Sequence, residues 1–250
     1  MTDTGRSETS YRDASAGASA RAMAREIARS ERGPLLVKSG VAGLALGLAG
    51  GVALGWGVGL ALGLVLALAV GLALRARGRA SYWRRGALGE RRTGRRLDRL
   101  RRRGCVVLHD LAVPGSRANI DHVVIGPFGV GVVDSKQRRG HVRFDGRGHL
   151  RIGNTGAPLL VKSVKWESGK VDSVLSVELG RRVPVLPVLA VHVSRSRFPQ
   201  WREFECLGVP IMAANNTGRW LMSRQRALSA SEVAVVADAV RARFTPHGQR

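Results

Sequence analysis

Residues 120–136 read IDHVVIGPFGVGVVDSK. Two runs rich in Val and Ile flank a Gly-Pro-Phe-Gly break, and this pattern predicts a β-hairpin with its turn at 126–129. If this turn is correct, antiparallel pairing places Asp121 directly opposite Asp134. The Cβ atoms of such a pair lie roughly 4.5–5.5 Å apart, and like charges placed there repel each other. Unless one of the two carboxyl groups is protonated, something must offset that repulsion.

A divalent cation held by both carboxylates would do so, and hard oxygen ligands suit Mg²⁺ or Mn²⁺. Because side chains alternate along a strand, Lys136 lies on the same face as Asp134. Ser135 points to the other face, which leaves its backbone carbonyl as a candidate further ligand. A metal, two carboxylates and a lysine can hydrolyse a phosphodiester. The same spacing also fits two strand-end aspartates in surface turns beside a solvated lysine, so the spacing alone leaves both interpretations open.

The sequence around this hairpin predicts a mixed sheet with helices against it, an α/β fold. The expected helices cover residues 82–103, 159–179 (with a weak point at Gly169) and the stretch that follows a candidate N-cap at Ser229 or Ser231. The expected strands cover 105–111, two short runs within 141–152, and runs near 183–193 and 208–214.

Residues 39–74 contain no charged side chain. One helix of this length, at ~1.5 Å per residue, would exceed a hydrocarbon core of ~30 Å. Two short membrane helices over 34–74, turning near Gly50-Gly51 or at 55–57, fit better, and one tilted span is the alternative. Glycine recurs at every fourth position from Gly43 to Gly63, which favours close helix packing. The preceding residues, 1–33, are polar, with disorder expected first and then a candidate amphipathic helix.

Arginine and lysine flank the apolar stretch on both sides, so both ends are expected in the cytoplasm and the protein in the cell membrane. Two cysteines, Cys105 and Cys206, form no disulfide framework and agree with a reduced compartment. The formal net charge of +23 favours polyanionic partners. We assign the basic linker 75–85 to anionic lipid and the arginines of 91–103 to nucleic acid, whether DNA or RNA.

Two stretches, GERRTGRRLDRL at 89–100 and VVLHDLAVPGSRANIDHVVIGPFGVGVVDSK at 106–136, resemble the nuclease-related domain, NERD, of the PD-(D/E)XK nuclease superfamily. The resemblance is close over 86–145 and looser over the rest of 86–250. It implies a restriction-endonuclease-like α/β fold and metal-dependent cleavage of nucleic acid. Two features depart from the family pattern: position 134 is more often Glu, and the helix segment KSVKWES lacks an expected Gln.

The resemblance also implies roles for individual residues. Asp121 and Asp134 would bind the metal, Lys136 would be the catalytic lysine, and Glu90 would be the acid of the first helix that supports the site. Other candidates follow from position: Glu167 as a supporting group, His122 as a core histidine, and four arginines that contact nucleic acid, namely Arg91, Arg92, Arg95 and Arg96. The alternative function is a nuclease-fold module without catalysis, which binds nucleic acid or a protein partner at the membrane.

Overall fold

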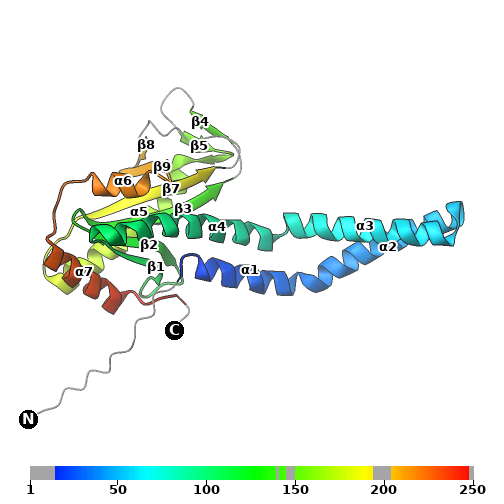
Figure 1. The fold of residues 1–250 in the computed structure, drawn as a ribbon, viewed down its shortest axis with the longest axis horizontal. Helices are drawn as coiled ribbons and strands as arrows, with labels where there is room; N and C mark the ends of the chain where they lie inside the picture. The colour runs from blue at the N-terminus through cyan, green and yellow to red at the C-terminus, as the bar shows by residue number, and fades with distance from the viewer. Residues whose placement is uncertain (1–14, 139–140, 145–149, 194–203, 248–250) are drawn as a thin grey trace, which may run out of the picture. The chain divides into compact units, whose positions relative to one another are not determined.

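The computed structural model describes residues 15–138, 141–144, 150–193 and 204–247. The chain divides into two compact units, residues 19–87 and residues 88–250 together with the first 18 residues. Residues 145–149, within the stretch 141–152 where two short strands were expected, lie outside the described residues. We consider each unit by itself (Figure 1).

The first unit is a helical hairpin of apolar helices, as expected. Helix α1 (Ala18–Ser30) precedes α2 (Arg32–Leu54) and α3 (Trp56–Arg77), and the turn falls at Gly55, one of the two positions that the sequence indicated. Glycines line the contact between α2 and α3: a Cβ atom added at Gly43 would lie 2.6 Å from the carbonyl oxygen of Gly63. This close approach lets the two backbones pack directly on each other.

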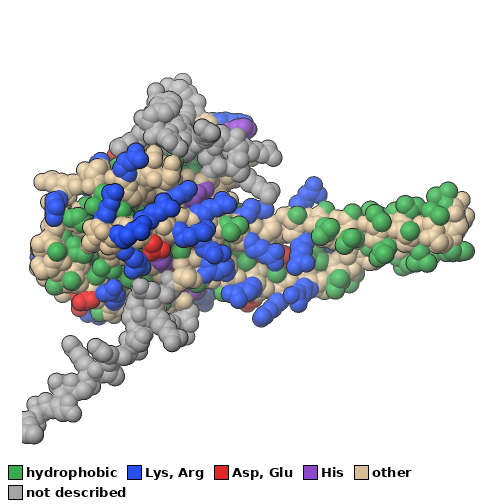
Figure 2. Space-filling view, in the orientation of Figure 1, with side chains coloured by type: hydrophobic (Ala, Val, Ile, Leu, Met, Phe, Trp, Pro, Cys, Tyr) green, Lys and Arg blue, Asp and Glu red, His purple; other side chains and the backbone are tan. Residues whose placement is uncertain are grey.

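The two helices are longer than the short spans expected from the sequence, because both extend into the charged flanks. Each is long and apolar enough to cross a membrane by length and composition. Their large apolar side chains face outward, including Leu60 and Leu64 at 73% exposure, and Figure 2 shows this apolar surface along the hairpin. The segment expected to be a linker, 75–85, is helical instead: α3 ends at Arg77 and α4 (Arg79–Leu97) begins after Gly78.

The second unit is built on a six-stranded mixed sheet in the order β1-β2-β3-β7-β9-β8. The strands are β1 (Val106–Ala112), β2 (Asn119–Gly126), β3 (Gly129–Arg138), β7 (Val185–Val193), β8 (Phe204–Cys206) and β9 (Val209–Ala213). Strand β7 runs parallel to both β3 and β9, and the other pairs are antiparallel. A separate small sheet joins β4 (Val142–Phe144), β5 (Leu150–Ile152) and β6 (Thr155–Gly156). The expected mixed α/β fold is confirmed.

The β2–β3 hairpin has the register that the sequence predicted. Ile125 pairs with Val130, and the ladder continues from there to the pair His122 and Val133. Gly129 has a φ of 106°, and a side chain there would collide with the carbonyl of Pro184. Only glycine suits both requirements, so the turn fixes where each strand starts.

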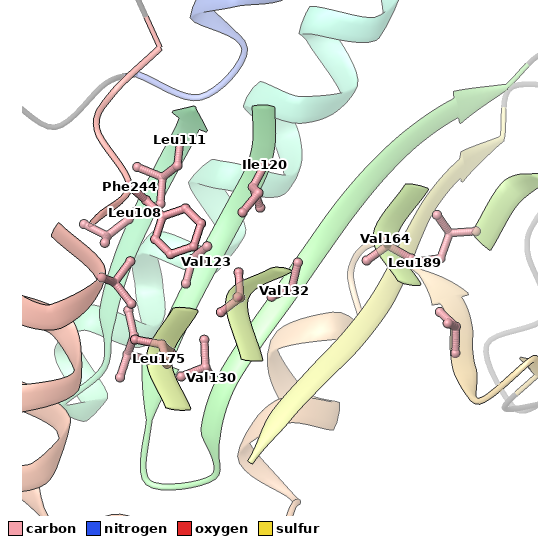
Figure 3. Close-up of a cluster of buried hydrophobic side chains, with 14 of the residues drawn as sticks. Leu108, Leu111, Ile120, Val123, Val130, Val132, Val164, Leu175, Leu189 and Phe244 are labelled. Atoms are coloured by element: carbon pink, nitrogen blue, oxygen red, sulfur yellow. The ribbon is translucent and has the colours of Figure 1, made fainter. Parts of the chain in front are cut away.

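Helices cover both faces of this sheet. Helix α5 (Ala157–Leu179) and helix α7 (Ala230–Arg243) pack on the face that carries Val123, Val130 and Val132, as Figure 3 shows. The end of α4, the 3₁₀ helix η1 (Asp98–Arg103) and helix α6 (Thr217–Met222) pack on the opposite face. Helix α5 runs through Gly169 without a break, and Ser229 caps α7 with a capping box to Glu232.

Candidate active site

The ladder between β2 and β3 stops just where the two aspartates stand. Its last pair is His122 with Val133, so Asp121 and Asp134 are the next residues on the two strands. Beyond that point a side chain replaces the backbone contact: Oδ2 of Asp121 accepts a hydrogen bond of 2.8 Å from the backbone N–H of Ser135. The carboxylate of Asp121 therefore reaches across to β3 at the place where the strands separate.

Asp134 is almost fully buried, with 2% of its surface exposed. Its Oδ2 atom receives two donors, Nζ of Lys136 at 2.7 Å and the hydroxyl of Ser163 at 2.5 Å. Its Oδ1 atom is buried and has no hydrogen-bond partner among the described residues. A buried carboxylate oxygen without a donor is costly, so this atom is a candidate ligand for a cation.

Helix α5 adds a third acid. Glu167 follows Ser163 by four residues, so both side chains project from the same face of the helix. Glu167 is buried, and its Oε2 atom also lacks a hydrogen-bond partner within the described part of the chain. Two unsatisfied carboxylate oxygens therefore belong to neighbouring acids.

The pKa values of Asp121, Glu167 and Lys136 are shifted by burial and by the charges of their neighbours. Burial raises the pKa of Asp121 well above its ordinary value, and the charges of Glu90 and Asp134 raise it further. Burial and the charge of Asp134 raise the pKa of Glu167 to about 8. Burial opposes the charge on Lys136, yet the carboxylates of Asp134 and Asp121 outweigh it and raise the pKa of the ammonium. Lys136 thus stays protonated, and one lysine faces several carboxylates.

Residues 85–192 match the family model of the nuclease-related domain. This segment of the chain is a NERD domain. The match covers α4 from Arg85 onward, the β2–β3 hairpin and α5, which carry the acids, and most of β7. No curated protein and no solved structure matches the chain.

The NERD domain brings four of the predicted site residues together: Asp121, Asp134 and Lys136 from the hairpin, and Glu90 from α4. Ser135 lies between the two strand residues, and its N–H is already engaged by Asp121. The predicted orientation of its side chain is confirmed, since its hydroxyl lies 3.1 Å from Nε2 of His122 on the opposite face. His122 itself is fully buried, as expected of a core histidine.

The described residues include no group of three or more His, Cys, Asp or Glu side chains already arranged to hold a metal. At Asp134, Lys136 and Ser163 both contact one of the two carboxylate oxygens. The donor set nevertheless fits a hard divalent cation, because unpartnered oxygens of Asp134 and Glu167 remain beside Asp121.

The four arginines proposed for nucleic acid lie on α4. Arg91, Arg92 and Arg95 are exposed, and Arg96 is partly buried. Burial lowers the pKa of Arg96, and repulsion from Arg99 and Arg92 lowers it further. The second effect reflects the crowding of positive charges on this segment. Figure 2 shows Lys and Arg side chains gathered where Figure 1 draws α4.

Sequence reasoning did not find the contribution of Ser163, nor the closeness of Glu167 to Asp134. Both residues are separated from the hairpin by the small β4–β6 sheet, and only the fold brings α5 against β3. The available signal was their four-residue spacing on one face of a predicted helix, which places a hydroxyl and a carboxylate together without saying what they meet.

Proposed function

We propose that this chain is a membrane-anchored nuclease that uses a divalent cation to hydrolyse the phosphodiester bonds of nucleic acid. The NERD domain gives the nuclease-related character. The observation that carries the finer proposal is the excess of carboxylates at the end of the β2–β3 ladder, where Asp121, Asp134 and Glu167 share one lysine. Such a cluster is poised to bind a cation.

In this proposal Asp121 and Asp134 hold the cation, Mg²⁺ or Mn²⁺, with the Ser135 carbonyl as a further ligand. The bound cation would lower the pKa of a water molecule and polarise the phosphate. Glu167 would support the site from α5: its Oε2 has no hydrogen-bond partner among the described residues, and its charge interacts with that of Asp134. Glu90 supports the site through its charge next to Asp121.

Lys136 acts by its charge rather than as a base. In the metal-free protein, against the effect of burial, the carboxylates of Asp134 and Asp121 raise its pKa, which favours the protonated ammonium. A protonated lysine instead stabilises negative charge that develops on the phosphate. The arginines of α4, namely Arg91, Arg92, Arg95 and Arg96, would bind backbone phosphates without reading sequence.

The helical hairpin would anchor this enzyme in the cell membrane. Its outward-facing leucines suit contact with lipid rather than water. Positive charge at both ends favours a cytoplasmic position for both, which places the NERD domain in the cytoplasm. The arginines of 75–85 would then lie near anionic lipid headgroups.

A cleavage assay tests this function. The full chain in detergent micelles is incubated with labelled DNA and RNA, single-stranded and duplex, in Mg²⁺, in Mn²⁺ and in EDTA. We expect cleavage that needs the cation and falls at least about 100-fold in Asp134→Ala and in Lys136→Ala. The control is Glu178→Gln, which alters a surface ion pair between Glu178 on α5 and Arg243 on α7. Salt-sensitive binding without cleavage under any of these conditions would contradict the proposal and indicate the inactive binding module.

A further inference from the structure

A chain of polar groups crosses the sheet face opposite the acids. Nε2 of His109 lies 3.2 Å from Oδ1 of Asp98, the Nδ1 atoms of His109 and His122 lie 2.9 Å apart, and Nε2 of His122 lies 3.1 Å from the hydroxyl of Ser135. The two histidines and Ser135 are buried. Asp98 is partly exposed, and Arg101 holds the same carboxylate oxygen from outside at 2.9 Å.

When both imidazole rings are neutral, the contacts allow only one assignment of hydrogen-bond donors and acceptors along this row of polar groups. The Asp98 carboxylate can only accept, so Nε2 of His109 carries a proton and its Nδ1 accepts. Nδ1 of His122 must then donate to His109, which leaves Nε2 of His122 to accept from the Ser135 hydroxyl. Every ring nitrogen in the pair is satisfied in this arrangement, as buried polar groups require.

Ser135 connects this chain to the candidate active site. Its hydroxyl faces His122 on one side of the sheet, and its backbone N–H donates to Asp121 on the other side. Strand β7 pairs with β3 through Ser135 and Ala190, so the peptide of residue 135 is held on that edge. On the β2 side the ladder has ended at His122, and there the Ser135 N–H bonds to Asp121 and its hydroxyl lies against His122. Rotation of this peptide would weaken its hydrogen bond to Asp121.

We propose that Asp98, His109 and His122 form a positioning relay that holds Ser135 and, through the Ser135 N–H, the carboxylate of Asp121. These residues do not touch the reacting groups, so the relay acts only through the geometry of Asp121. Its importance for cleavage rests on the proposed nuclease function, but the relay itself does not. It can therefore be tested without a substrate.

The direction of the relay is measurable by nuclear magnetic resonance of the full chain in detergent micelles with ¹⁵N-labelled histidine. We expect protons on Nε2 of His109 and Nδ1 of His122. In Asp98→Ala, Nε2 of His109 loses the carboxylate that favours a proton there, so the opposite proton positions should become populated at both histidines, including His122, which is linked to Asp98 through His109. Asp98→Asn keeps an acceptor oxygen and should retain the wild-type pattern. A change confined to His109, or a wild-type His122 protonated on Nε2, would overturn the relay.

A second measurement follows the amide proton of residue 135. In Ser135→Ala its exchange with solvent should become roughly tenfold faster, the effect of losing about one hydrogen bond. Ser135→Thr keeps the hydroxyl and should restore slow exchange. The matched control is Ser168→Ala, a buried serine on α5 whose hydroxyl bonds to the carbonyl of Lys165. Equal exchange rates in wild type and Ser135→Ala would refute the positioning role even if the protein cleaves nucleic acid. Confirmed exchange and proton patterns without cleavage would refute only the nuclease proposal.

Discussion

The backbone N–H of Ser135 donates to Oδ2 of Asp121 across 2.8 Å, at the point where the β2–β3 ladder has ended. A carboxylate thus takes the place of a carbonyl as the partner of a strand amide. This contact stabilises the charged form of Asp121, whereas burial and the charges of Glu90 and Asp134 oppose it and raise its pKa. Lys136 offsets part of this cost, and in the proposed function a bound cation would offset more of it.

Removing the lysine should destabilise the protein and make it depend on metal. Lys136→Met leaves Asp134 buried without its ammonium partner. We expect a loss of about 3 kcal/mol in the free energy of unfolding, because one charge of a buried pair remains uncompensated. Mg²⁺ should recover part of this loss. Thermal unfolding followed by near-ultraviolet circular dichroism measures it, and Lys162→Met, at an exposed position of α5, is the control. Equal stability of both variants would argue against a strong Lys136–Asp134 interaction.

The raised pKa of Glu167 predicts how stability changes with pH in EDTA. An ordinary glutamate has a pKa of 4.5, whereas Glu167 has a pKa of about 8 in the folded protein. Between these values the folded chain retains a proton that the unfolded chain has released, so stability should fall as pH rises from 4.5 to 8. Asp121, whose pKa is also raised, acts in the same direction.

Glu167→Gln removes this titration, and the decline of the thermal midpoint with pH should become shallower in the variant. Saturating Mg²⁺ should flatten the wild-type curve as well, because cation binding favours the ionised carboxylates. A variant whose midpoint declines as steeply as the wild type in EDTA would show that Glu167 does not titrate in this range.

Close packing of the hairpin helices predicts a sharp difference between two neighbouring glycines. A methyl group at Gly59 would collide with the backbone of Gly51 across the hairpin, whereas one at Gly57 meets nothing within 4 Å. Gly59→Ala should therefore destabilise the hairpin by roughly 1–3 kcal/mol, and Gly57→Ala should not. Cysteines placed on α2 and α3 report the distance between the two helices through disulfide cross-linking in membranes. Equal cross-linking in both variants would contradict the packing.

The arginines of α4 should bind phosphates without regard to sequence. Replacing Arg92 and Arg96 by Gln should weaken binding to unrelated DNA sequences equally and reduce the slope of log affinity against log salt by about 1 for each lost contact. Fluorescence anisotropy in EDTA measures the slope without cleavage. Arg241→Gln on α7, where the arginine pairs with Asp238, is the control. An unchanged slope in the double variant would remove α4 from the binding surface.

Much of the hairpin could be predicted from local sequence. The alternation of side chains between the two sheet faces and the Gly-Pro-Phe-Gly turn were enough to predict the strand register. The register in turn predicted on which face of the sheet Asp134, Ser135 and Lys136 lie. Composition and length also predicted two apolar helices and gave two positions for their turn, one of which, at Gly55, the structure has. These features depend on residues close together in the chain, where periodicity carries the information.

Features that depend on distant contacts could not be read in this way. Glu90 and Glu167 reach the hairpin from separate helices, and no spacing within either helix indicates their closeness to Asp121 or Asp134. The pairing of His109 with His122 arises from the β1–β2 register, which the intervening loop does not specify. The sequence predicted a helix only from residue 82, so the helical structure within 75–81 was not predicted.

The central claim is that Asp121 and Asp134 hold a divalent cation between them. Anomalous diffraction from crystals of the full chain grown with Mn²⁺ tests it most directly. We predict a manganese peak at roughly 2.0–2.3 Å from an oxygen of each aspartate, with Lys136 displaced from Asp134 or shared with the ion. Fully occupied manganese elsewhere, with Lys136 still on Asp134 and no peak between the two carboxylates, would contradict the claim.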